Sequence, residues 1–298
     1  MLSESVRQLM AINALLALSI YLTLACGQLS LANAAFMGIG AYVSATLTIN
    51  AGWPFWGALL AAIIAPTLAA AIVGLPTLRL RGVFLAIATI GLGEVLRVVV
   101  INIQQVGGAE GISSIPVKTQ NWQLALALVV AVFILWRLRG SRMGYAFEAI
   151  REDETAARTM GINTTFYKLM AFMLSAALAG LAGGLKAHLF RTIGPGDYGF
   201  VQAVDILTYA VVGGSIIFFG PILGAVLLTA LPELLRSSFL RGLDIQAGWQ
   251  TQFLNGLILL LVIIFLPNGL VSLLNRRARR PTPLASESGT AVEAKVDA

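Results

Sequence analysis

The sequence predicts an all-α fold, a polytopic membrane helix bundle with about 8–10 transmembrane elements, some of them broken or half-spanning. Its 298 residues are 58% hydrophobic with a mean hydropathy of +0.85, which is more apolar than soluble globular domains. Apolar runs recur at lengths that cross roughly 30 Å of hydrocarbon. Lysine and arginine gather at the ends of these runs, mainly on one side, as membrane orientation requires.

Uninterrupted apolar runs mark the expected spans. They occupy residues 8–26, 57–75, 83–103, 122–138, 167–187 and 251–267. No small-residue cleavage site follows the first run, and further runs come after it, so we expect a retained span rather than a signal peptide.

Two regions carry interruptions. Region 29–49, "LSLANAAFMGIGAYVSATLTI", is rich in glycine and serine, which favours a broken or re-entrant helix covered by protein. Region 206–235 would measure about 45 Å as one helix at 1.5 Å per residue. The Gly220-Pro221 pair at its middle predicts a break there, because a helix usually ends before a proline.

Charge sets the expected orientation and domain division. Basic loop 139–166 and basic tail 275–280 are expected in the cytoplasm, and the tryptophan-bearing stretch 50–56 at the outer interface. This gives a transmembrane domain over residues 1–275 and a basic, then disordered, cytoplasmic tail over 276–298. The side of the N-terminus stays open, since it depends on whether 29–49 crosses.

Missing residue types exclude most chemistry. Cys26 and His188 are the single cysteine and histidine, both expected to pack, and HExxH, CxxC and GxSxG do not occur. We therefore expect no metal, no cofactor and no enzyme activity. No lysine follows a glycine, so the phosphate-binding GxxxxGK[ST] loop is absent and any ATP must be hydrolysed by another chain. The basic residues lie at span ends, which topology explains without a nucleic-acid partner.

Polar residues inside apolar segments are candidates for a path. Glu94 and Arg97 stand near the middle of span 83–103 on one helix face, where facing lipid would cost each roughly 3 kcal/mol. They form either a structural ion pair or part of a path lining. Gln28, Ser30 and Asn33 either contact a passing solute or bond to neighbouring helices.

Small residues recur at spacings that let helix backbones approach closely. The glycines concerned are Gly38, Gly40, Gly180, Gly184, Gly220 and Gly224. We expect them to pack helices.

The stretch "EAIREDETAARTMGINT", residues 148–164, carries six charged side chains in eleven positions of a chain that is only 11% charged. It predicts two short helices, the second with Asp153 as N-cap, Glu154 and Arg158 complementing its two ends, and Gly161 closing it in a left-handed conformation.

Mixed charge around a small apolar face favours docking of this loop into a protein groove. The face would consist of Phe147, Ile150, Ala157 and Met160. A plain solvated loop is the alternative.

Several segments together resemble the inner-membrane permeases of branched-chain amino acid ABC importers, in the M-type branch. The resemblance runs over residues 10–272. It rests on "GQLSLANAAFMGIGAY" (27–42), "LRLRGVFLAIATIGLGE" (78–94), "GGAEGI" (107–112), "SRMGYAFEAIREDETAARTMGI" (141–162) and "FGPILGA" (219–225). The chain departs from the family's pattern at two places. Ile216 and Ile217 stand where family members usually have a second Gly-Ser pair, and Lys186 stands where they commonly have an aromatic residue.

The resemblance implies a subunit of a bacterial plasma (inner) membrane importer that works by alternating access. Its partners would be a second permease subunit, two cytoplasmic ATPases and an extracytoplasmic solute-binding protein, within membrane lipid. The charged loop would be the coupling helix that contacts an ATPase. The residues carried over are Glu148, Ala149, Arg151, Glu152, Asp153, Glu154, Arg158 and Gly161.

The solute implied is a branched-chain or other hydrophobic amino acid. Urea or a short-chain amide is the alternative, because similar importers move them. A stand-alone channel or secondary transporter is the alternative from a different class; it would not need the docking element, and we see no convincing internal duplication.

Overall fold

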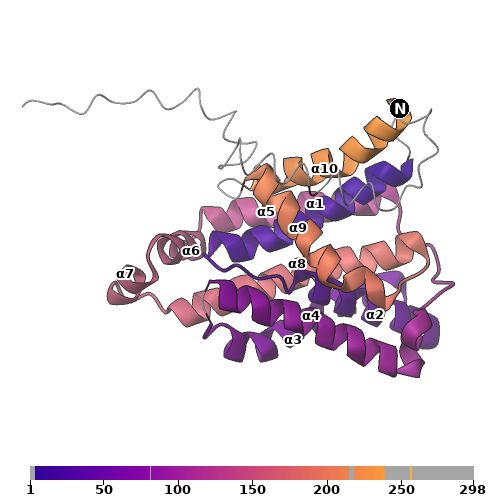
Figure 1. Cartoon of the computed structure of the whole chain (residues 1–298), viewed down its shortest axis with the longest axis horizontal. Coiled ribbons are helices and arrows are strands. Elements are labelled where there is room, and N and C mark those ends of the chain that lie inside the picture. Colours follow the sequence, from indigo (N-terminus) through magenta and orange to yellow (C-terminus); the bar gives the residue numbers. More distant parts are fainter. Residues whose placement is uncertain (1–3, 81, 215–217, 239–255, 257–298) are drawn as a thin grey trace, which may run out of the picture.

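The computed structural model describes residues 4–80, 82–214, 218–238 and 256, and these form a bundle of helices (Figure 1). No strand element forms in this part of the chain; a single bridge joins Ile112 to Ile193. Five helices are long and apolar enough to cross a membrane, namely α1, α3, α4, α5 and α8. The predicted all-α polytopic bundle is confirmed.

The helices of the bundle follow one another in chain order. They are α1 (Glu4–Ala25), α2 (Asn33–Asn50), α3 (Phe55–Thr77), α4 (Val83–Asn102), α5 (Asn121–Arg139), α8 (Thr164–Phe190), α9 (Phe200–Gly213) and α10 (Phe219–Ser238). Short helices connect them. These are η1 (Gln104–Val106), η2 (Gly108–Glu110), α6 (Arg142–Glu152), α7 (Glu154–Thr159) and η3 (Pro195–Tyr198).

The bundle has two distinct ends. α6 and α7 project at one end, which we call the charged end, and the N-terminus lies at the opposite, far end (Figure 1). Asn121, which begins α5 at the far end, donates a hydrogen bond to the side chain of Glu4. The N-terminus and the loop before α5 therefore lie on the same side of the bundle.

One predicted interruption is absent and the other is shifted. The first, a broken or re-entrant helix in region 29–49, is wrong, because the non-helical connection 26–32 leads into α2, which is one continuous helix about 27 Å long. The second lies after Gly213, so the expected break at Gly220-Pro221 is wrong in position. Pro221 falls in the first turn of α10, where its missing N–H removes no helical hydrogen bond. The predicted span 251–267, tail 276–298 and Ile216-Ile217 lie outside the described residues, apart from Gly256.

Glycines bring the central helices into backbone contact. A Cβ on Gly40 of α2 would collide with the backbone of Gly180 on α8, and one on Gly180 would collide with Ala62 O and Pro66 of α3. α8 thereby packs closely on both α2 and α3. The predicted role of these small residues in helix packing is confirmed at this crossing.

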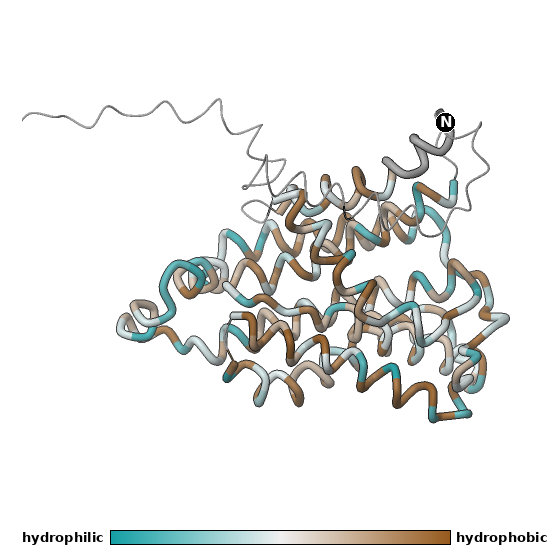
Figure 2. Tube along the Cα trace, in the orientation of Figure 1, coloured by the Kyte–Doolittle hydropathy of each residue, from teal (hydrophilic) through white to brown (hydrophobic). Residues whose placement is uncertain are grey.

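The outer helices expose apolar faces. On α3, Leu60, Ile64, Leu68 and Ile72 form a row at helical spacing and all are exposed. Figure 2 shows hydrophobic colours along the bundle helices and hydrophilic colours at α6 and α7. Lipid or a second membrane subunit must cover such a surface.

Candidate functional site

The charged loop folds into α6 and α7 through local capping. Ser141 caps α6 by accepting from Gly144 N at 3.4 Å. Asp153 Oδ1 accepts from Thr155 N at 2.7 Å and from Ala156 N at 3.0 Å, as the sequence predicts for an N-cap. Gly161 closes α7 at φ +83°, in the predicted left-handed conformation.

The apolar face of the loop points into its own bundle. Phe147, Ile150 and Ala157 are buried in a cluster with Cys26 and Ala171. The expectation that these three residues form a docking face is therefore wrong, because the bundle already covers them. Cys26 is fully buried, which is consistent with its predicted packing role.

Met160 differs from the rest of the predicted apolar face. Its side chain is 83% exposed, next to the helix end that Gly161 closes. Any partner at this site would meet Met160 and charged side chains rather than a broad apolar face.

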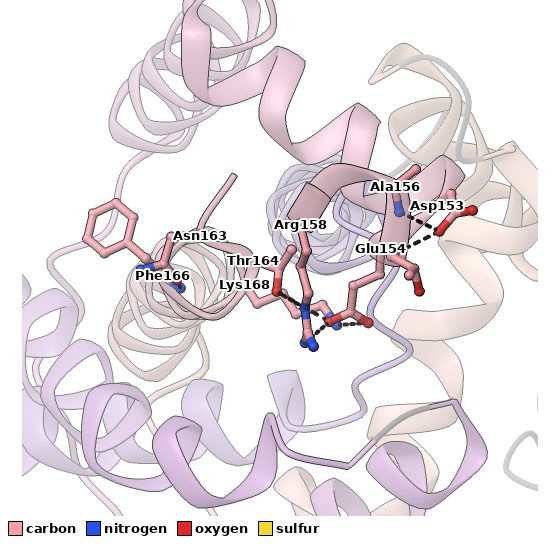
Figure 3. A network of polar contacts seen from close by, with 9 residues as sticks. Asp153, Glu154, Ala156, Arg158, Asn163, Thr164, Phe166 and Lys168 are labelled. Atoms are coloured by element: carbon pink, nitrogen blue, oxygen red, sulfur yellow. Dashed lines mark hydrogen bonds and ion pairs between the residues drawn. The ribbon is translucent and has the colours of Figure 1, made fainter. Parts of the chain in front are cut away.

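An ion-pair network ties α7 to the start of α8 (Figure 3). Glu154 accepts from Arg158 at 2.7 Å and from Lys168 Nζ at 2.8 Å, and Arg158 Nε donates to Thr164 Oγ1 at 2.9 Å. The side chains of Glu154 and Lys168 are only 17% and 11% exposed. Glu154 therefore anchors α7 to a membrane helix in addition to complementing the α7 N-terminus.

The other predicted docking residues lie on the outer surface of α6 and α7. We call this the coupling surface, and it comprises Glu148, Arg151, Glu152, Asp153, Arg158 and Gly161, with Ala149 half-buried among them. A groove of about 470 Å³ adjoins it, lined by residues at the end of α3 and by Glu154 and Arg158. Six of the predicted residues are thus exposed on α6, on α7 or at their ends, whereas Glu154 is largely buried.

The coupling surface touches the connection between α1 and α2. Gly27 sits at φ +72°, and a Cβ there would lie 3.1 Å from Arg151 Cα. This close approach places the end of α6 directly against the segment that carries Gln28 and Ser30.

The predicted path residues of this segment divide into two kinds. Asn33 Nδ2 donates to Ser19 Oγ at 2.7 Å and to Ser175 Oγ at 2.8 Å, so it bonds to neighbouring helices. Ser30 Oγ accepts from Ala32 N. Gln28 is buried, and neither amide atom has a hydrogen-bond partner in the described part of the chain.

Glu94 and Arg97 form an ion pair at 3.0 Å on α4. Their side chains are 42% and 46% exposed, so the bundle itself does not cover them. At the depth of a membrane span this pair needs water or another subunit against it. Leu31 N donates to Thr89 Oγ1, so the pair lies roughly 8–12 Å farther along α4 than the connection that carries Gln28.

Five polar residues near the far end were not predicted as site residues. Lys186 Nζ lies 5.8 Å from the ring centroid of Tyr198, whose ring packs edge-on against Tyr42 at 5.9 Å. Asp197 of η3 and, more weakly, Asp205 of α9 interact electrostatically with Lys186. Lys186 and Asp205 stand at the edges of predicted spans, where a charge signals only a span end; the packing of four separate elements brings them together.

Comparison with known proteins places the chain in a family. The family model described as branched-chain amino acid transport system / permease component matches residues 4–266. The high-affinity branched-chain amino acid transport system permease proteins LivM of Salmonella typhimurium and Escherichia coli are each 34% identical over 82% of this chain. The chain spans 64% of the length of each of these relatives.

A relative with a different printed solute also matches. The autoinducer 2 import system permease protein LsrC of Salmonella typhi is 33% identical over 55% of this chain and 49% of its own length. The chain belongs to the family of permease components of branched-chain amino acid transport systems.

Proposed function

We propose that the chain is the permease subunit of an ATP-binding-cassette importer in the bacterial inner membrane. It forms a translocation path for branched-chain or other hydrophobic amino acids by alternating access, together with a second permease subunit. Two separate cytoplasmic ATPases hydrolyse the ATP, and an extracytoplasmic binding protein delivers the solute at the far end. The observation that carries the proposal is the exposed coupling surface, fixed to the bundle in a member of this family.

Two contacts supply a route for motion from an ATPase into the bundle. The ion pair of Glu154 with Lys168 joins α7 to α8, which packs on α1, α2 and α3. The contact of Arg151 with Gly27 joins α6 to the α1–α2 connection. A displacement of α6 and α7 by closing ATPases would therefore move α8 and the connection together.

The solute class is the less constrained part of the proposal. LsrC is named for autoinducer 2 import, so members of the family serve systems for more than one kind of solute. Urea or a short amide stays the alternative. A stand-alone channel or secondary transporter would leave the coupling surface without a partner.

Charge reversal on the coupling surface tests the docking of the ATPase. We expect Glu148→Lys combined with Glu152→Lys to lower ATP-dependent uptake at least tenfold in the assembled complex, because like charges would face the ATPase groove. Uptake and ATP hydrolysis are measured in liposomes. Asp153 is left intact, because its carboxylate caps α7 and its loss would destabilise the helix by about 1 kcal/mol.

The matched control for the charge reversal is Glu110→Lys, which makes the same change in η2 at the far end. It should leave uptake unchanged. Equal uptake by the double variant and the wild type would contradict docking and would show that the loop is a plain solvated connection.

Glu94→Gln tests whether the ion pair on α4 lines the path. A half-exposed pair contributes at most about 1 kcal/mol to stability, so the variant should fold and assemble normally. Uptake should fall severalfold, because an uncompensated Arg97 would alter the field in the path. Complex yield and uptake are measured together, with Glu4→Gln at the far end as control. Loss of assembly instead of uptake would assign the pair to helix packing.

A further inference from the structure

The unpredicted polar cluster near the far end combines side chains from four elements. Tyr42 comes from α2, Tyr198 from η3, Lys186 from α8 and Asp205 from α9. η3 is held tightly against α2, because the Cβ and Cγ of Tyr198 occupy the space beside Gly38 that a side chain would fill. The cluster therefore has a fixed geometry in spite of the short helix that carries Tyr198.

The two tyrosine hydroxyls are buried without partners. Neither Tyr42 Oη nor Tyr198 Oη has a hydrogen-bond partner among the described residues, and both side chains are more than nine-tenths buried. An unpaired buried hydroxyl costs about 1–3 kcal/mol, and phenylalanine would fill the same space without that cost. A bound ligand, water or partner group would satisfy these hydroxyls.

The charges of the cluster are complementary and separated. Lys186 and Asp205 are each half-buried, and Lys186 interacts electrostatically with the exposed Asp197 carboxylate of η3 and, more weakly, with Asp205; no direct ion pair joins Lys186 to either carboxylate in the described part of the chain. An amino acid carries a carboxylate and an ammonium group on one carbon atom. Such a zwitterion placed between Lys186 and Asp205 would meet an opposite charge on each side, and its carboxylate oxygens could accept from tyrosine hydroxyls.

We propose that Lys186, Asp205, Tyr42 and Tyr198 bind the charged groups of a zwitterionic amino acid as it enters the bundle from the far end. The inference rests on the proposed function and names its solute class. Lys186 contacts the carboxylate, Asp205 the ammonium group, and the side chain of the amino acid lies outside the cluster. The adjoining Gly199 lies beside Glu94 and Arg97, which continue the polar surface along α4.

Tyrosine-to-phenylalanine variants test the hydroxyls without disturbing packing. Tyr198→Phe and Tyr42→Phe should leave the thermal stability of the full importer complex unchanged or higher, because each removes an unpaired buried group. ATP-dependent leucine uptake should fall at least fivefold, while ATP hydrolysis stimulated by the binding protein continues. Tyr167→Phe, at a half-buried tyrosine near the start of α8 and outside the cluster, is the control and should keep full uptake. Full leucine uptake by both cluster variants would overturn the inference.

Lysine-to-methionine variants test whether the positive charge of Lys186 binds the solute carboxylate. Lys186→Met should lower leucine uptake at least tenfold and raise the ATP hydrolysed per leucine transported, whereas Lys118→Met, outside the cluster, should do neither. If the wild-type complex takes up no amino acid with ATP, the proposed function fails. If it does, and Lys186→Met equals it, only the inference fails. If Lys186→Met prevents assembly, the phenylalanine variants decide: normal uptake by them shows that the cluster is a structural brace.

Discussion

Gly180→Ala is expected to destabilise the bundle by about 3 kcal/mol or more, one of the largest effects of any single methyl group in this chain. The added Cβ would collide with Ala62 O and with Pro66 of α3, and Gly40 of α2 already contacts the Gly180 backbone. Neither the carbonyl nor the proline ring can move without shifting a whole helix. Alanine has the higher helix propensity, by about 1 kcal/mol, so the loss would arise from packing alone.

Gly91→Ala supplies the matched control for this effect. Gly91 lies inside α4, and a Cβ there would meet no atom within 4 Å. This variant should be slightly more stable than the wild type, since it gains only helix propensity. Thermal unfolding and yield in detergent measure both variants. A Gly180→Ala protein as stable as Gly91→Ala would contradict the close α2–α8–α3 crossing.

Lys168→Met is expected to destabilise the protein by about 1–3 kcal/mol, because the largely buried carboxylate of Glu154 loses its 2.8 Å partner and keeps the half-exposed Arg158. α7 should then detach from α8, so uptake should fall together with thermal stability. Protection of the α7 amides from hydrogen exchange reports the detachment directly.

Arg158→Met is the control for this ion pair, since it removes the other cation bound to Glu154. The guanidinium side chain is 51% exposed, so its pair contributes at most about 1 kcal/mol. Adding Glu154→Gln to Lys168→Met should recover part of the lost stability by removing a largely buried carboxylate that has lost one of its cations. Equal effects of Lys168→Met and Arg158→Met would mean that the Lys168 pair is solvated.

Local patterns in the sequence predict the charged end well. Asp153 and Gly161 act within one helical turn, so their roles in capping follow from neighbouring residues alone. The recurrence of apolar runs likewise gives the long helices. The predicted break between α9 and α10 is misplaced because a proline is tolerated in the first turn of a helix, and Pro221 lies in the first turn of α10.

Local sequence patterns do not predict contacts between elements that are distant in the chain. The burial of Phe147 and Ile150 against Cys26 depends on how α6 folds back onto the bundle. Lys186 and Asp205 stand nineteen residues apart on different helices, and only the packing of α8, α9 and η3 brings them to one place. The sequence alone therefore does not show that these two residues belong to one cluster.

The hydrogen bonds of Asn33 have a consequence for synthesis of the protein. α2 is not among the five helices that length and hydropathy mark as able to cross a membrane, and its first residue bonds to Ser175, 142 residues later. At roughly 5–20 residues per second, the ribosome needs about 7–30 s to make that distance. During this interval the nascent α2 has only part of its polar contacts, so its final insertion waits for α8 to emerge.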